Sequence, residues 1–204
     1  MCGRYAFMPE DLEPGVLEAI RRINREAEWL KGDVRPGDTP PAIVMQQGAP
    51  AAMAMKWGMA APEGNRLVIN ARSESAQEKG MFAGLIPGHR CLLPATLYYE
   101  WTRGTAHTRM KVRGEGGLYM AGLYRPTAES TAGWEFVILT QAANDDMALI
   151  HDRMPLILPE KEQRRGWLRD ESAARRILER PPKLRLWAEA DEPEQLDLFA
   201  AMEM

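Results

Sequence analysis

The feature that most constrains the fold of this chain is a long series of short, apolar, β-like runs separated by turn residues. Dipeptides that favour turns, such as Pro36-Gly37 and Gly116-Gly117, stand between many of the runs. The pattern predicts an α+β domain with a mainly antiparallel, barrel-like β core and peripheral helices. The expected strands span residues 42–45, 52–57, 67–70, 90–101, 110–112, 118–124, 135–140, 156–158 and 184–187.

Helical signals are fewer. In the segment Pro9–Leu30 apolar residues recur at helical spacing among charges, and Gly32 closes the pattern. Further helices are expected at about residues 75–85, 145–150 and 160–178. The length of 204 residues suits one domain, which we place at residues 1–187. Residues 188–204 form an expected acidic, flexible tail, because they are too poor in apolar residues to fold alone.

The composition, with 45% hydrophobic and 27% charged residues, is that of a water-soluble globular protein. No apolar run approaches the roughly 18–20 residues that a membrane span needs. The N-terminus also lacks the basic-then-apolar pattern of a signal peptide. We therefore expect no membrane contact and a cytoplasmic, nucleoid-associated location.

The net charge of −3 argues at first against a nucleic-acid partner. However, residues 188–204 hold six of the 29 acids and no base, which leaves 26 bases against 23 acids in residues 1–187. This balance is too weak to imply DNA binding. It does permit a local basic cleft.

The two cysteines, Cys2 and Cys91, suggest neither a disulfide framework nor a metal site, and no cofactor is expected. Cys91 is interpreted as a small buried core residue.

Removal of Met1 would leave Cys2 with a free α-amine beside its thiol, and the ordinary pKa values of these two groups are about 7.7–8.0 and 8.5. Such a pair condenses with an aldehyde to a Schiff base and then closes a thiazolidine ring. A carboxylate and a histidine nearby would suit the proton transfers. For an arbitrary protein, a residue without function is the alternative.

Four polar-and-apolar blocks occur in order along the chain. They are Met-Cys-Gly-Arg-Tyr5, Leu67-Val-Ile-Asn-Ala-Arg72, Tyr98-Tyr-Glu-Trp101 and Leu149-Ile-His-Asp-Arg-Met-Pro155. Together they resemble the SRAP family of abasic-site-processing proteins, formerly called SOS-response-associated peptidases, from Cys2 to about Leu158. The resemblance implies an antiparallel β core, binding of single-stranded DNA, and a covalent thiazolidine between Cys2 and an abasic deoxyribose.

The resemblance also implies roles for four residues. Cys2 is the nucleophile, Asn70 orients its amine, Glu100 shuttles protons during Schiff-base formation, and His151 is the acid for sugar ring opening and for reversal. Each side chain suits its role: the Asn70 amide both donates and accepts hydrogen bonds, and partial desolvation of Glu100 would favour proton transfer. The alternatives are a turn residue at 70, a solvated strand residue at 100, and a histidine that caps a helix or pairs with Asp152.

Four residues are candidate DNA ligands. Arg4 and Arg72 flank the proposed reactive residues and offer forked donors to phosphate. Trp57 would stack beside the abasic gap, and Arg153 could extend the phosphate track. A basic strand could extend it too, through Arg109, Lys111 and Arg113. The alternatives are surface ion pairs for Arg4 and Arg72, core packing for Trp57, and a solvated strand face for the basic strand.

The chain departs from the family pattern in several places. Leu97 stands where glycine is expected, and Asp33 and Arg35 replace small or amide residues. Beyond Trp187 the usual closing segment of the family has no counterpart. The chain there carries Gln195-Leu-Asp-Leu-Phe199, which looks like the pentapeptide that binds the bacterial sliding clamp, with Gln195 as polar anchor. Its expected apolar anchors are Leu196, Leu198 and Phe199. Docking on the protein's own body is the alternative.

The leading hypothesis is an enzyme or shield that traps abasic sites in single-stranded DNA through Cys2. One alternative is a cysteine peptidase that acts through the Cys2 thiolate with His151 as base, in the narrowest case only to remove its own Met1. The other is a non-catalytic single-strand binding module.

Overall fold

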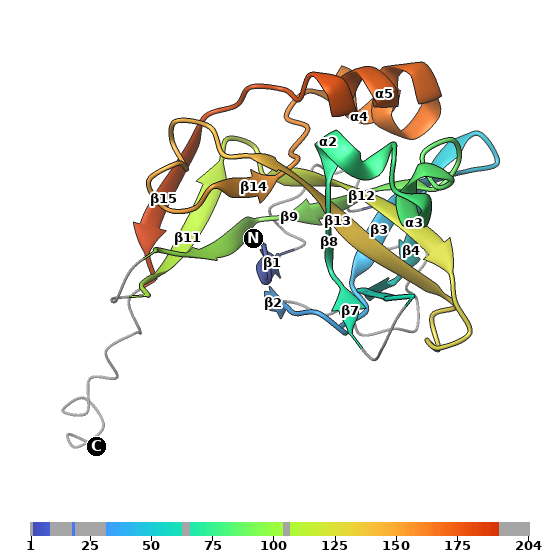
Figure 1. Cartoon of the computed structure of the whole chain (residues 1–204), viewed down its shortest axis with the longest axis horizontal. Helices are drawn as coiled ribbons and strands as arrows, with labels where there is room; N and C mark the ends of the chain where they lie inside the picture. The colour runs from blue at the N-terminus through green and yellow to red at the C-terminus, as the bar shows by residue number, and fades with distance from the viewer. Residues whose placement is uncertain (1, 9–17, 19–31, 63–65, 104–106, 192–204) are drawn as a thin grey trace.

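The computed structural model describes residues 2–8, 18, 32–62, 66–103 and 107–191. Within these residues two curved sheets pack around a common core, and short helices cover the outer face of one of them (Figure 1). Nearly all strand pairs are antiparallel. The predicted α+β fold with a mainly antiparallel, barrel-like core and peripheral helices is therefore confirmed.

The smaller sheet has five strands in the order β15-β11-β10-β1-β2, and every neighbouring pair is antiparallel. Its strands are β15 (Leu186–Ala190), β11 (Arg109–Gly114), β10 (Leu97–Trp101), β1 (Tyr5–Phe7) and β2 (Gly32–Val34). Strand β1 lies between β10 and β2, so residues 5–7 are held inside the sheet.

The larger sheet has eight strands, six of them in the order β14-β13-β12-β9-β3-β4. Strands β5 and β8 pair with β13 in parallel, and β6 with β7 forms a separate small sheet. The bounds are β14 (Arg153–Pro155), β13 (Trp134–Ala142), β12 (Leu118–Pro126), β9 (Arg90–Ala95), β3 (Pro41–Gln46), β4 (Ala49–Ala54), β5 (Lys56–Trp57), β6 (Met59–Ala60), β7 (Leu67–Val68) and β8 (Asn70–Arg72).

The predicted run at residues 90–101 bends at Thr96 and belongs to both sheets, with β9 in the larger and β10 in the smaller. The Thr96 amide donates a hydrogen bond to the Ala6 carbonyl (2.9 Å), and its Oγ1 accepts one from the Met8 amide (3.1 Å). The corner between β9 and β10 is therefore bonded to the β1 segment through both the main chain and the side chain of Thr96.

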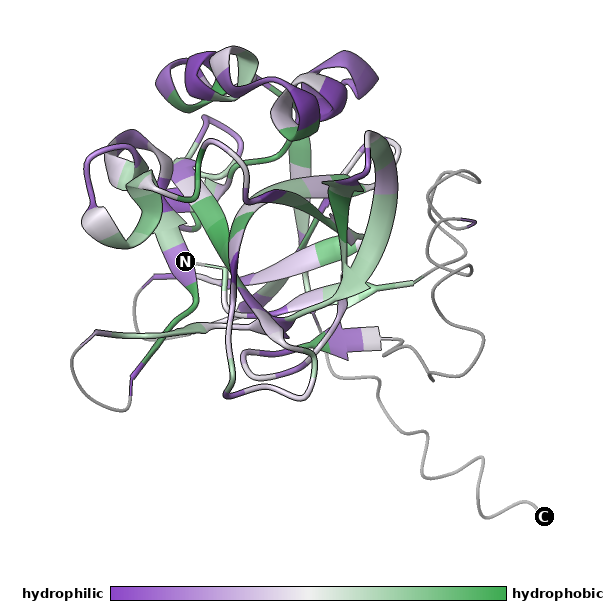
Figure 2. Ribbon diagram, turned by 90° about the vertical axis from the view of Figure 1, so that its right-hand side faces the viewer, coloured by the Kyte–Doolittle hydropathy of each residue, from purple (hydrophilic) through white to green (hydrophobic). Residues whose placement is uncertain are grey.

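Two apolar cores result from this arrangement. The inner core lies between the sheets and contains the fully buried Tyr5, Trp57 and Cys91. The outer core lies between the larger sheet and the helices, around Trp167. Figure 2 shows hydrophobic residues concentrated along the strands and hydrophilic residues along much of the helices. Burial of each large apolar side chain stabilises the fold by about 1.5–3 kcal/mol. The prediction that Cys91 is a buried core residue is confirmed.

The described helices are α2 (Ser73–Ala76), α3 (Gly80–Ala83), α4 (Lys161–Arg169) and α5 (Glu171–Glu179). The single helix expected at residues 160–178 is thus two, because Asp170 leaves the helical conformation and caps α5. Its carboxylate accepts hydrogen bonds from the Ser172 and Ala173 amides at 2.8 and 3.2 Å.

Other expectations need correction or lie outside the described residues. Residues 145–150 form consecutive turns and not a helix, and the Asn144 side chain accepts a hydrogen bond from the Met147 amide there. The helix expected at Pro9–Leu30 lies outside the described residues apart from Glu18. Strand β15 reaches Ala190, so the folded part extends beyond the expected boundary at residue 187. None of the described helices is long and apolar enough to cross a membrane.

Candidate active site

The pairing of β1 with β10 brings the Cys2 segment beside Glu100. The pairing continues beyond β1, because the Tyr99 amide donates a hydrogen bond to the Arg4 carbonyl at 2.9 Å. The negative charge of Glu100 is close enough to affect the pKa of the Cys2 thiol. Glu100 is only 3% exposed, and its carboxylate accepts a hydrogen bond from the Trp101 amide (3.3 Å). The alternative of a solvated strand residue at this position is therefore wrong.

Asn70 contacts Cys2 directly. It begins β8, and its Nδ2 donates a hydrogen bond to the Cys2 carbonyl oxygen at 2.8 Å. Among the described residues the buried Oδ1 of Asn70 has no hydrogen-bond partner. One end of this amide is thus fixed on Cys2, while the other end has an unused acceptor. Buried acceptors of this kind are uncommon in native proteins and call for an explanation.

The Cys2 side chain is completely buried, and its Sγ lies 3.8 Å from the Arg4 carbonyl oxygen. Burial raises the pKa of the Cys2 thiol to about 12, and the charge of Glu100 adds to the shift. The thiol is therefore protonated at neutral pH. A mechanism that begins with a thiolate is disfavoured in this environment.

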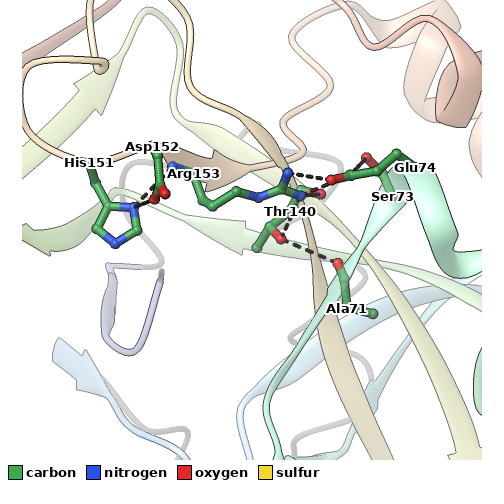
Figure 3. Close-up of polar contacts among 7 residues, drawn as sticks. All are labelled: Ala71, Ser73, Glu74, Thr140, His151, Asp152 and Arg153. Carbon is green, nitrogen blue, oxygen red and sulfur yellow. Dashed lines mark hydrogen bonds and ion pairs between the residues drawn. The ribbon is translucent and has the colours of Figure 1, made fainter.

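His151 lies just before β14, and Asn70 begins β8. Both β14 and β8 pair with β13, so β13 holds the segments of His151 and Asn70. Its side chain is 23% exposed. The ring Nδ1 accepts a hydrogen bond from the Arg153 amide (3.0 Å) and lies 2.8 Å from an Asp152 carboxylate oxygen (Figure 3). The expected pairing of His151 with Asp152 is present, and it is compatible with a role in proton transfer.

Two of the candidate phosphate ligands are already engaged within the protein. The Arg4 guanidinium forms an ion pair with Asp33 and lies over the Tyr99 ring, 5.1 Å from its centroid. Arg153 binds the Glu74 carboxylate through both terminal nitrogens and also donates to the Thr140 carbonyl oxygen (2.8 Å; Figure 3). The contact of Arg4 agrees with its ion-pair alternative, and the Arg153 guanidinium is held by Glu74.

Arg72, in contrast, is exposed at the end of β8. It also directly precedes α2, two positions before Glu74. Of the four residues proposed as DNA ligands, Arg72 is the one most accessible to solvent.

Trp57 is 0% exposed, and its indole N–H donates to the Ile69 carbonyl oxygen at 2.9 Å. Its ring stacks on Phe136 and packs against Tyr5. Stacking on DNA needs an accessible ring face, so the proposed DNA contact of Trp57 is corrected to the core-packing alternative.

Sequence reasoning missed the groups that organise these side chains. Glu74 binds the Arg153 guanidinium. Its position two residues after Arg72 is a signal that could have identified it as part of the site. Arg103, which contacts Asp152, has no distinguishing sequence signal. The proposed clamp anchors Gln195, Leu196, Leu198 and Phe199 lie outside the described residues. In the described part of the chain no group of three or more His, Cys, Asp or Glu side chains could hold a metal ion.

Comparison with known proteins gives a consistent result. The chain is 29% identical over 185 residues to the abasic site processing protein YoqW of Bacillus subtilis, a match covering 82% of this chain and 80% of that one. It is 28% identical over 197 residues to the abasic site processing protein YedK of Escherichia coli, covering 88% and 84%. The match to the abasic site processing protein HMCES of Xenopus tropicalis is 26% over 220 residues, covering 82% and 66%.

Solved structures agree with the sequence relatives. The crystal structure of a phage-related protein from Bordetella bronchiseptica matches with a TM-score of 0.70 at 26% identity, covering 92% of this chain and 94% of that one. The family model described as SOS response associated peptidase (SRAP) matches residues 1–190. The chain therefore belongs to the SRAP family.

Proposed function

We propose that this protein captures abasic sites in single-stranded DNA by forming a thiazolidine between Cys2, freed of Met1, and the deoxyribose aldehyde. The observation that carries the proposal is the hydrogen bond from Asn70 Nδ2 to the Cys2 carbonyl, together with the unused Oδ1 of the same amide. An α-amine on Cys2 would be a suitable donor for that Oδ1. Asn70 then holds the first residue at both its carbonyl and its amine.

The reaction starts from the amine. The Cys2 nitrogen adds to C1′ of the open-chain sugar and gives a carbinolamine, which loses water to form a Schiff base. The thiol then adds to the same carbon, and its proton goes to the nitrogen. One water is released for each crosslink, and no oxidant or cofactor is needed.

The environment of the thiol supports this order. In the chain that carries Met1, burial raises the pKa of the thiol to about 12, and a buried thiol of this kind is a poor initial nucleophile. It becomes effective once the imine carbon lies beside it, because the second step is intramolecular. The same protonated state makes the alternative cysteine peptidase less favourable, since that chemistry starts from a thiolate.

Glu100 and His151 are suited to the proton transfers. Glu100 is buried close to Cys2 and can accept the amine proton and return it when water leaves. His151, partly exposed just before β14, can protonate the ring oxygen as the closed sugar opens. Arg72, exposed at the end of the β-strand that Asn70 begins, supplies positive charge for the DNA phosphates.

The test uses a single-stranded oligonucleotide with one abasic site and the full chain, with loss of Met1 verified by intact mass. Denaturing gels should show a shifted band for the wild type and for Cys91→Ala, the matched cysteine control, but not with undamaged DNA. Cys2→Ser keeps an amine but cannot close the thiazolidine, so its adduct should survive only after borohydride reduction. A wild-type protein that lacks Met1 and forms no band would refute the proposal and favour the peptidase.

A further inference from the structure

Asp152 links His151 to a cation on another segment. The same carboxylate oxygen of Asp152 lies 2.8 Å from His151 Nδ1 and 2.8 Å from a terminal nitrogen of Arg103. Arg103 comes from the connection between β10 and β11, three residues after Glu100. The array Arg103–Asp152–His151 therefore connects the segment that carries one proposed proton-transfer residue to the segment that carries the other.

The Nδ1 atom of His151 stands between a donor and an acceptor. The Arg153 amide, at 3.0 Å, can only donate to it, whereas the Asp152 carboxylate, at 2.8 Å, can only accept from it. In a neutral imidazole one nitrogen carries the proton and the other the lone pair. The amide therefore favours the tautomer with the proton on Nε2, and the carboxylate favours the tautomer with the proton on Nδ1.

These two tautomers have opposite chemical properties at Nε2. With Nδ1 protonated, Nε2 has a lone pair and can take a proton. With Nε2 protonated, that nitrogen is a donor only. A carboxylate on Nδ1 also stabilises the doubly protonated imidazolium, which is the form that gives a proton away.

Arg103 competes with His151 for the Asp152 carboxylate. Partial desolvation acts to raise the pKa of the Asp152 carboxyl, but the hydrogen bond and the charge of Arg103, together with the charge of His151 and a main-chain hydrogen bond, lower that pKa below its usual value. A carboxylate stabilised in this way is a weaker acceptor for the imidazole N–H. Arg103 thus limits how strongly Asp152 selects the Nδ1-protonated form.

We propose that Asp152 is a positioning residue that sets the tautomer of His151, and that Arg103 tunes it by binding the same carboxylate oxygen. The inference rests on the proposed function for the step that His151 serves, the opening of the abasic sugar. Arg103 and Asp152 are 56% and 65% exposed, so their ion pair contributes little to stability. Effects of their substitution on the reaction are therefore not effects on folding.

The first test measures the tautomer directly and needs no DNA. Protein labelled with ¹⁵N-histidine is studied by long-range ¹H–¹⁵N correlation spectra, with His151→Gln identifying the resonances. Asp152→Asn should move His151 towards the form protonated on Nε2, and Arg103→Gln should move it towards the form protonated on Nδ1. Arg113→Gln is the matched control, because Arg113 pairs with Glu189 and not with Asp152. Unchanged resonances in Asp152→Asn would overturn the inference.

The second test follows crosslinking under single-turnover conditions. General acid–base catalysis contributes about 10²–10⁴-fold, so loss of the carboxylate that stabilises the proton-donating imidazolium in Asp152→Asn should slow the reaction roughly 10-fold or more at unchanged final yield. Asp152→Glu should restore most of the rate. Equal rates in Asp152→Asn and the wild type would contradict the inference. If the wild type forms no crosslink while the tautomer still follows Asp152, the proposed function fails and the positioning role stands.

Discussion

Asn70 and Cys2, 68 residues apart in the sequence, are joined by a hydrogen bond of 2.8 Å from the Asn70 side-chain amide to the Cys2 carbonyl oxygen. The bond fixes the main chain of the residue proposed to react, independently of the thiol. Positioning of the amine is therefore separable by experiment from the chemistry of the sulfur.

Asn70→Asp tests this positioning. The substitution keeps the size of the side chain, removes the donor to the Cys2 carbonyl and adds a charge to the region of Glu100. We expect a loss of about 0.5–1.5 kcal/mol in unfolding free energy from the lost bond and a crosslinking rate lower by at least about 10-fold. Urea unfolding and a gel time course measure the two. A rate equal to that of the wild type would show that Asn70 does not orient the amine.

The buried thiol predicts a dependence of stability on pH. Because its folded pKa is raised from 9.0 to about 12, the folded state binds the thiol proton more tightly than the unfolded state does. The resulting stabilisation is complete below about pH 9 and is lost as the pH rises towards 12, by about 1.4 kcal/mol at pH 10. Urea midpoints at pH 8 and pH 10 should differ less for Cys2→Ala than for the wild type. Identical differences in the two proteins would contradict the assignment to Cys2.

Arg72 is predicted to contribute more to DNA binding than Arg153 does. Arg72 is exposed, whereas Arg153 is held by Glu74. Loss of one phosphate contact lowers the slope of log affinity against log salt by about 0.7 for single strands. Fluorescence anisotropy with an undamaged oligonucleotide should show this change for Arg72→Gln and a smaller one for Arg153→Gln. Arg165→Gln, exposed on α4, should leave the slope unaltered.

Trp57→Phe should affect stability and not DNA affinity. The substitution removes the 2.9 Å indole donor to the Ile69 carbonyl, which keeps the Ile138 amide as a donor (3.1 Å), and leaves unfilled space beside Phe136. We expect a loss of about 1–3 kcal/mol in unfolding free energy, measured by urea unfolding. If anisotropy instead showed weakened DNA binding in a fully folded variant, the stacking role would have to be restored.

Deletion of residues 194–204 tests the proposed clamp contact. The segment Gln195–Phe199 carries two leucines and a phenylalanine next to acidic residues, a pattern suited to a preformed apolar pocket. We expect the deletion to abolish pull-down of a bacterial sliding clamp and to leave abasic-site crosslinking intact. Retained pull-down would reject this role for the segment.

The sequence predicted the candidate reactive residues more fully than it predicted their surroundings. Cys2, Asn70, Glu100 and His151 occur in short blocks with distinctive neighbours, so their segments were recognisable. The antiparallel core followed from strand length and turn residues.

What the sequence could not predict depends on tertiary pairing. The burial of Trp57 is decided by the two-residue strand β5 and its register with β13, which no local period reveals. The ion pair of Arg153 with Glu74 and the contact of Arg103 with Asp152 join residues 79 and 49 positions apart. Local pattern also failed at residues 145–150, where side-chain capping by Asn144 favours turns over a helix.

The corner at Thr96 links the position of Glu100 to the main chain of the β1 segment. One continuous segment runs from Cys91 in the inner core to Glu100, and Thr96 fastens it to the strand that follows Cys2. The placement of Glu100 relative to the Cys2 segment therefore depends on the main-chain path through Thr96. Variation in such a protein is expected to be tolerated more readily in the connecting loops than at the Thr96 corner, where the two sheets and the β1 segment meet.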